Sequence, residues 1–156
     1  MEKEYIDTII VYTDGACQKA GCGYGVYFPN KELRNLSRKF TKEPLTNQRA
    51  ELYAIYKALN KICRYYTFNK IKIYSDSEYS IKSLTIWIKN WKKNNWKTSN
   101  KKPVMNVDII TKIDKILGKH IGKISFTHVR AHTGKTDEHS LGNAKADKLA
   151  TLGAQS

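Results

Sequence analysis

Short β-branched apolar runs, each closed by a turn-forming residue, dominate the first half of the chain. The run Thr8 to Thr13 stops at Asp14, and the run Ile71 to Ser75 stops at Asp76. Both runs have the length and composition of β-strands. The same pattern predicts three further strands, over Gly23 to Phe28, Leu33 to Phe40 and Ile121 to His128. A hairpin turn is expected at Pro29-Asn30-Lys31.

Apolar residues at helical spacing fill most of the remaining sequence. Thr46-Asn47 provides a helix cap, and the apolar pattern that follows runs to Ile62. Because this helix separates the two strands that end in aspartate, it predicts a strand–helix–strand crossover that makes them parallel neighbours. Further helices are expected over Ile81 to Asn94, Val104 to Leu117 and Leu141 to Leu152, with a polar loop over Lys97 to Pro103. No repeat or linker interrupts the pattern, which predicts one α/β domain over residues 1–156.

The two strand-ending aspartates predict a metal site. Asp14 and Asp76 would lie side by side at the carboxyl edge of the sheet, where open α/β sheets bind ligands. Two neighbouring negative charges repel, so one carboxyl must hold a proton or a cation must join them. Carboxylate oxygens are the ligands that Mg²⁺ and Mn²⁺ prefer.

The charge of the chain indicates a polyanionic partner. Lys and Arg number 28 against 14 Asp and Glu, for a net charge of +14 and a pI near 9.7. Nucleic acid is the commonest partner of so basic a protein, while a solubility excess of lysine is the alternative.

Cysteine use and hydropathy indicate the compartment. Cys17 and Cys22 could pair across a turn, but a reduced state is favoured for them and for Cys63. No apolar run approaches the roughly 20 residues that span a bilayer, and the first residues do not form a signal peptide. We expect an intracellular protein, cytoplasmic or nuclear and not secreted.

Two more carboxylates stand among small and apolar neighbours. Glu51 lies in the first turn of its helix, on a face shared with Ile55 and Leu59, where it could pair with the helix dipole or point over the sheet edge. Asp147 lies among alanines in the last helix, where a solvated charge is the alternative.

Four separated motifs resemble type 1 ribonuclease H in their order along the chain. They are Tyr12-Thr13-Asp14-Gly15, Thr46-Asn47-Gln48-Arg49-Ala50-Glu51, Tyr74-Ser75-Asp76-Ser77, and His132-Thr133-Gly134 followed by Gly142-Asn143 and Ala146-Asp147. The resemblance covers residues from about 8 to 153. It implies the ribonuclease H-like α/β fold, a five-stranded mixed sheet flanked by helices on both faces. No separate hybrid-binding domain is expected.

The resemblance also implies an activity. It indicates an endoribonuclease that cuts the RNA strand of RNA/DNA hybrids by a two-metal-ion mechanism, leaving 5′-phosphate and 3′-hydroxyl ends. The expected metal ligands, which are also catalytic, are Asp14, Glu51, Asp76 and Asp147, and they would hold two Mg²⁺, with Mn²⁺ able to substitute. His132 would be a mobile catalytic histidine that moves a proton or assists product departure. A monomer that binds the hybrid and no membrane is expected.

The resemblance assigns the contacts with nucleic acid as well. Trp87 and Trp91 would pack on the sugars of the DNA strand, with a pair of core tryptophans as the alternative. The other expected contacts are Gly15, Thr46, Asn47, Gln48, Ser99 and Asn106. Thr46 and Asn106 would bind a DNA phosphate, while Asn47 and Gln48 would meet the minor groove and the 2′-hydroxyls.

The chain departs from the family pattern in two places. Pro44 stands where nuclear-type enzymes carry an arginine, so either the DNA-phosphate pocket is weaker here or Lys42 substitutes for the arginine. The loop from Gly134 to Leu141 is longer than in many relatives and carries a second histidine, His139.

Three rival functions remain open. A nuclease of the same fold could act on branched DNA, which the Thr46 to Gln48 triplet and the tryptophan pair disfavour. A hybrid-binding module without catalysis would lack a carboxylate. A domain cut from a reverse transcriptase would be expected to show a linker.

Overall fold

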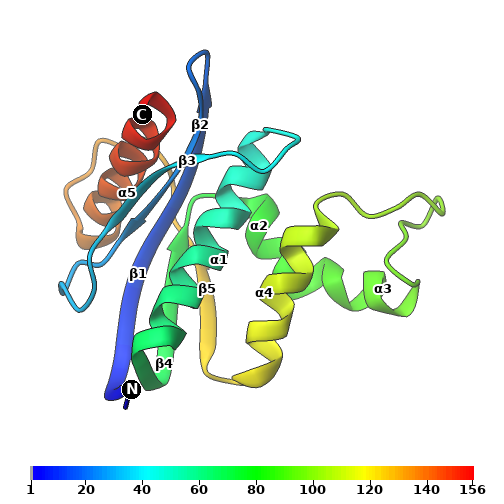
Figure 1. The fold of residues 1–156 in the computed structure, drawn as a ribbon, viewed down its shortest axis with the longest axis horizontal. Helices are drawn as coiled ribbons and strands as arrows, with labels where there is room; N and C mark the ends of the chain where they lie inside the picture. Colours follow the sequence, from blue (N-terminus) through cyan, green and yellow to red (C-terminus); the bar gives the residue numbers. More distant parts are fainter. Residues whose placement is uncertain (1) are drawn as a thin grey trace.

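A mixed five-stranded sheet forms the centre of the computed structural model, which describes residues 2–156. The strands lie in the order β3-β2-β1-β4-β5 (Figure 1). Their bounds are β1 Glu4–Gln18, β2 Gly21–Tyr27, β3 Leu36–Phe40, β4 Tyr66–Ser75 and β5 Ile124–His128. The first three strands form an antiparallel meander, and β4 and β5 run parallel to β1. The expected five-stranded mixed sheet is confirmed.

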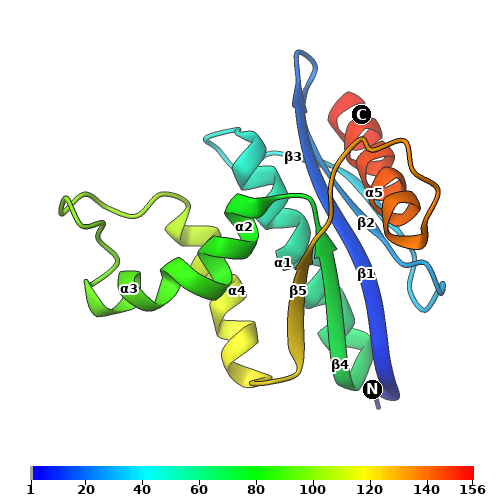
Figure 2. The same cartoon turned by 180° about the vertical axis from the view of Figure 1, so that it is seen from behind.

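Helices cover both faces of this sheet, as Figures 1 and 2 show. The helix α1 spans Asn47–Tyr65 and packs on one face, while α5, Glu138–Gln155, packs on the other. A nearly continuous helical segment follows β4, made of α2 Glu78–Lys82, a π-helical turn η1 Ser83–Trp87, and α3 Ile88–Lys93. The helix α4, Val107–Lys119, packs beside α1. In Figure 1, α3 and the loop that follows it project away from the sheet.

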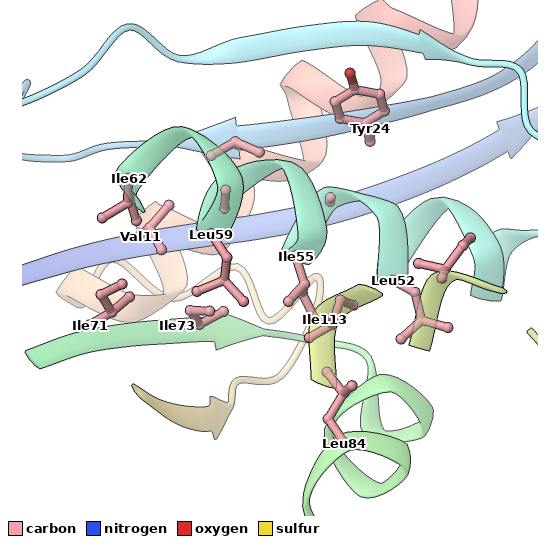
Figure 3. Close-up of a cluster of buried hydrophobic side chains, with 14 of the residues drawn as sticks. Val11, Tyr24, Leu52, Ile55, Leu59, Ile62, Ile71, Ile73, Leu84 and Ile113 are labelled. Carbon is pink, nitrogen blue, oxygen red and sulfur yellow. The ribbon is translucent and has the colours of Figure 1, made fainter. Parts of the chain in front are cut away.

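The main core lies between α1 and the sheet. Most of its side chains come from alternate positions of the strands and from the inner face of α1, as expected for a period of two in strands and 3.6 in helices, and η1 and α4 add others. Figure 3 shows this cluster, which includes Val11, Tyr24, Leu52, Ile55, Leu59, Ile62, Ile71, Ile73, Leu84 and Ile113. These side chains are buried, so the crossover helix is fixed against both strands that carry the aspartates.

Close backbone contact replaces side-chain packing on the other face. A Cβ placed on Gly25 would lie 2.4 Å from the carbonyl oxygen of Ala146, and one on Gly23 would lie 2.2 Å from the nitrogen of Ala154. The glycines of β2 therefore let α5 approach the sheet.

Several predicted boundaries differ from the structure because local hydrogen bonds decide them. The strand β3 begins at Leu36 rather than Leu33, since the Asn35 side chain accepts the amide of Phe28 and closes the preceding loop. The last helix begins at Glu138 rather than Leu141, because Asp137 caps it by accepting the amide of Ser140. The strand β1 extends beyond its predicted end and carries Asp14 within it.

The expectation that Cys17 and Cys22 are reduced is wrong. Cys17 of β1 and Cys22 of β2 face each other in the antiparallel register and form a disulfide. Cys63 is free. The strand register, which sequence spacing does not reveal, brings the first two together. No helix between residues 2 and 156 is long and apolar enough to cross a membrane.

We predict that Gly25→Ala lowers stability by about 1–3 kcal/mol, the usual cost of forcing a methyl group into a packed site. Gly118→Ala is the matched control, because a Cβ there meets nothing within 4 Å in the helix α4. That variant should be neutral or up to about 1 kcal/mol more stable. Urea unfolding of both variants measures the difference, and equal midpoints would contradict the close packing of α5.

Candidate active site

Three carboxylates from separate elements meet at the carboxyl edge of the sheet. Asp14 lies in β1, Asp76 directly follows β4, and Glu51 lies near the start of α1. One oxygen of each lies within 4.8 Å of the others. The parallel register pairs Thr13 with Ser75, which places the two aspartates at the same level. The juxtaposition predicted from the strand ends is present.

Gly15 allows Glu51 to reach this cluster. A Cβ at Gly15 would lie 2.4 Å from the backbone nitrogen of Glu51 and 2.9 Å from the Cβ of Ala50. Any larger residue would push the start of α1 away from β1. Close packing against α1 therefore explains why a glycine occupies position 15. Its contact with nucleic acid stays a prediction.

Asp147 completes the group from the opposite face of the sheet. It lies on α5, the helix that packs closely against β2, and it is near enough to Asp14 to raise the pKa of that carboxyl group. The fourth predicted carboxylate is thus adjacent to Asp14, although the tightest cluster contains only the other three.

The electrostatics of the cluster favour a cation. Burial raises the pKa of Asp14 far above its usual range, and Asp76, Asp147 and Glu51 raise it further. Burial also raises the pKa of Glu51, to about 7, while a hydrogen bond from Ser77 opposes the rise. Between residues 2 and 156, no lysine, arginine or histidine forms an ion pair with any of the four. Carboxylate oxygens held this way fit Mg²⁺ or Mn²⁺, whose charge would offset their repulsion.

His132 lies beside the cluster on the loop between β5 and α5. It is exposed, has a positive φ of 53°, and lines a cavity of about 240 Å³ together with Asp147. The structure thus places the histidine near one carboxylate rather than within the group of three.

Asn143 lines the same cavity and was not predicted to be functional. Its side chain is 3% exposed, and its Oδ1 atom has no hydrogen-bond partner. A buried acceptor without a partner is costly, so it marks a place where a donor would bind. The sequence offered a signal, since Asn143 follows Gly142 in one of the four motifs.

The second histidine of the longer loop has a different environment. The Nδ1 atom of His139 lies 2.7 Å from the hydroxyl oxygen of Tyr12, and its ring stacks on Tyr74 with centroids 4.3 Å apart. These contacts attach the start of α5 to β1 and β4. His139 is therefore held by the sheet, whereas His132 faces the solvent.

The predicted nucleic-acid residues at the start of α1 lie next to the carboxylates. Thr46 caps the helix by accepting the amide of Arg49, and Asn47 accepts the amide of Cys17 through its Oδ1 atom. Gln48 is exposed. The hydrogen bond from Cys17 fixes the side chain of Asn47 to the end of β1.

Asn106 lies across from these residues and is oriented by its neighbours. Its amide nitrogen donates to the hydroxyl of Tyr79 at 2.8 Å, and its Oδ1 atom accepts from Arg49 at 3.4 Å. Arg49, which was not predicted to be functional, is buried and forms a two-pronged ion pair with Asp108 at 2.8 and 2.9 Å. Pro44 lines the same surface pocket as Arg49 and Asn106. The buried Arg49 therefore lies in the same pocket as Pro44, the position where the family pattern has an arginine.

The tryptophan pair lies on the projecting segment and is neither fully exposed nor fully buried. The ring centroids of Trp87 and Trp91 are 6.0 Å apart, and both side chains are half-buried. Trp91 packs against the main core, while Trp87 packs against Tyr79. Each tryptophan therefore combines a structural contact with a partly exposed ring. Ser99 is exposed in the loop beyond them.

Comparisons with known proteins agree with this geometry. The RNase H family matches residues 7–155. A ribonuclease H of Schizosaccharomyces pombe is 42% identical over 153 residues, covering 95% of this chain and 53% of the relative. One of Orientia tsutsugamushi is 41% identical, covering 92% of this chain and 80% of the relative. This chain thus spans about half the length of the yeast relative.

Solved structures show the same fold. The PFV RNase H domain superposes with a TM-score of 0.74 at 28% identity, covering 94% of this chain and 93% of that one. The order of the motifs, the gathering of their carboxylates at one sheet edge and these matches lead to one conclusion: the chain belongs to the ribonuclease H family.

Proposed function

We propose that this protein hydrolyses the RNA strand of RNA/DNA hybrids and leaves 5′-phosphate and 3′-hydroxyl ends. The observation that carries the proposal is the meeting of Asp14, Glu51 and Asp76 within 4.8 Å, with Asp147 near enough to raise the pKa of Asp14 further. Relatives of high similarity are named ribonuclease H. The proposal treats residues 1–156 as one catalytic domain that acts as a monomer.

The four carboxylates would hold two Mg²⁺ ions. Bound there, the ions would activate a water molecule and stabilise the charge that develops on the leaving 3′-oxygen. The contribution of the protein is position, because the parallel strands and the packing of α1 and α5 fix the carboxylates before any ligand binds. Mn²⁺ has the same preference for oxygen ligands and would substitute.

His132 would move a proton at the edge of this site. Its loop places it beside Asp147 and open to solvent, so it can exchange a proton with the reacting phosphate and with water. Asn143 would donate its amide or accept a hydrogen bond in the same cavity.

The hybrid would cross the carboxylate edge between the start of α1 and the projecting segment. Thr46 and Asn106 would bind a phosphate of the DNA strand, while Asn47 and Gln48 would meet the 2′-hydroxyls of the RNA strand. Trp87 and Trp91 would pack on deoxyribose, and the lysines of α3 and its loop supply positive charge around them.

The structure bears on the rival functions. A binding module without catalysis has no need to gather four carboxylates at the cost of their mutual repulsion. A nuclease for branched DNA would not require 2′-hydroxyl contacts, so the choice of substrate distinguishes it from a ribonuclease H. The test is incubation of the protein with matched RNA/DNA, RNA/RNA and DNA/DNA duplexes, each with and without Mg²⁺. Cleavage of the hybrid alone, only with metal, is expected; preferential cutting of DNA/DNA would refute it.

We predict that Asp14→Asn abolishes Mg²⁺-dependent cleavage but makes the metal-free protein more stable at pH 7. The folded protein raises the pKa of Asp14, so ionisation costs stability once the pH exceeds its ordinary value of 3.8. Each unit by which folding raises the pKa of Asp14 lowers the stability of the folded protein by about 1.4 kcal/mol. Removing one such unit would raise Tm by roughly 3–5 °C. The gain should vanish below about pH 4, where the carboxyl is protonated in both states.

Asp7→Asn provides the control for that experiment, because Asp7 is an exposed carboxylate on the same strand, away from the cluster. It should change neither cleavage nor Tm. Substantial cleavage by the Asp14 variant, or a fall in its Tm at pH 7 without metal, would contradict the assignment.

We predict that His132→Ala slows turnover by roughly ten- to ten-thousandfold, the range expected for one proton-transfer group, and leaves hybrid affinity nearly unchanged. His139→Ala should instead lower the thermal midpoint, since it removes the contacts with Tyr12 and Tyr74. Single-turnover rates and melting curves of both variants separate the roles. A larger loss of rate in the His139 variant would show that His139, and not His132, is the catalytic histidine of this loop.

We predict that the double variant Trp87→Ala, Trp91→Ala loses hybrid affinity and some of its preference over RNA/RNA. Aromatic contacts with nucleotides contribute about 1–3 kcal/mol each. Because both rings are half-buried, the melting temperature will fall too, so affinity must be measured well below it. Tyr5→Ala, which removes an exposed aromatic ring far from the site, is the control. If unfolding accounts for the whole affinity loss, the tryptophans are structural only.

A further inference from the structure

A basic cleft lies between the second half of α1 and the edge strand β3, away from the carboxylates. Its volume is about 240 Å³, and four cationic side chains line it, namely Arg38, Lys57, Lys61 and Arg64. Tyr24, Tyr65, Leu36 and Asn60 form the rest of the wall. Figure 3 shows Tyr24 beside the core side chains of α1, on the strand β2 that pairs with β3.

The positive charge in this cleft has no acidic partner. The three ion pairs among residues 2–156 join Arg49 to Asp108, Lys82 to Glu78 and Lys92 to Asp114, so none includes a cleft residue. Burial lowers the pKa of Lys61, and the charges of Arg38 and Arg34 lower it further. Repulsion of this kind is relieved by an anion bound between the cations.

Neighbouring groups orient three of these cations. The ammonium of Lys61 donates to the carbonyl oxygen of Arg34 at 2.8 Å. The ammonium of Lys57 lies 5.9 Å from the ring centroid of Tyr53, and the guanidinium of Arg64 lies 5.7 Å from that of Tyr65. Such contacts reduce the freedom of long side chains, so less entropy is lost when they bind a ligand.

The cleft is separate from the proposed catalytic site. Along α1, at 1.5 Å per residue, Lys57 lies about 9 Å and Arg64 about 20 Å from Glu51. The cleft also lies on the α1 face of the sheet, whereas Asp147 lies on α5, which covers the other face. The predicted contacts with the hybrid therefore leave these four cations unused.

We propose that this cleft binds the phosphate backbone of a single-stranded nucleic acid. Arginine and lysine side chains bind phosphate oxygens, and a partly exposed ring such as Tyr65 offers a face to an unstacked base. The bases of a duplex are already paired and stacked, so only a single strand can offer a base to this ring. Acidic peptides share the charge but have no base to meet the ring.

The test compares a cleft variant, Arg38→Gln with Arg64→Gln, with a control of equal charge, Lys115→Gln with Lys119→Gln. The control lysines are exposed on α4, outside the cleft. Binding of a labelled oligothymidylate is measured without metal by fluorescence anisotropy, at several salt concentrations. The oligonucleotide is not a ribonuclease H substrate, so the result is independent of the proposed function.

We expect the cleft variant to bind the oligonucleotide about tenfold more weakly than the control, which corresponds to about 1.4 kcal/mol. The slope of log K against log salt should fall by about 0.7 for each phosphate that the variant no longer neutralises. Affinity for a short blunt-ended hybrid, and its rate of cleavage with Mg²⁺, should match those of the control. Melting curves of both variants establish that they are folded.

Three results would overturn the inference. The cleft variant and the control could show the same drop in affinity, which would mean that overall charge alone matters. Affinity for the blunt hybrid could fall as much as that for the oligonucleotide, which would place the cleft on the hybrid path. Polyglutamate could displace the oligonucleotide from the parent protein as well as unlabelled oligonucleotide does, which would make the cleft a site for acidic polypeptides.

Discussion

The repulsion among carboxylates at one edge of the sheet is the constraint on which the rest of the structure depends. Asp14, Glu51 and Asp76 lie close enough for their charges to oppose one another, and burial removes the water that would screen them. Such an arrangement persists only because the surrounding fold is stable without it. The buried core between α1 and the strands β1 and β4 holds all three elements together, and main-chain pairing holds the aspartates level.

Two different kinds of packing deliver the acidic residues to this edge. On the α1 face, large apolar side chains fill the space, and Gly15 alone permits close approach where the helix begins. On the α5 face, the glycines of β2 bring the helix backbone almost into contact with the sheet. Asp147 thereby reaches Asp14 from the side opposite to Glu51. A site built from both faces surrounds its centre with oxygen atoms, which is the environment that a hard cation requires.

The distribution of positive charge complements this acidic centre. A net charge of +14 includes the four carboxylates, so the surface beyond them is more basic still. Some of that charge surrounds the tryptophans on the projecting α3 segment, and some lines the cleft between α1 and β3. The helix α1 connects the carboxylates to this cleft, because Glu51 lies near its start and the cleft lies along its second half. Nucleic acid held at one end of this helix is within reach of the other.

The sequence by itself determined the parallel pairing of the aspartate strands and the helix between them, because strand and helix periods and turn residues are local signals that agree here with the fold. It also indicated the four acidic residues through their motifs. Only the tertiary structure decided that Cys17 faces Cys22, that the tryptophans are half-buried, and that Arg49 pairs with Asp108. In the tertiary structure the buried Oδ1 atom of Asn143 has no hydrogen-bond partner, and four cationic side chains line one cleft between α1 and β3. Each of these depends on register or on contact between distant segments, and a local pattern carries no information about which residues of two packed elements will meet.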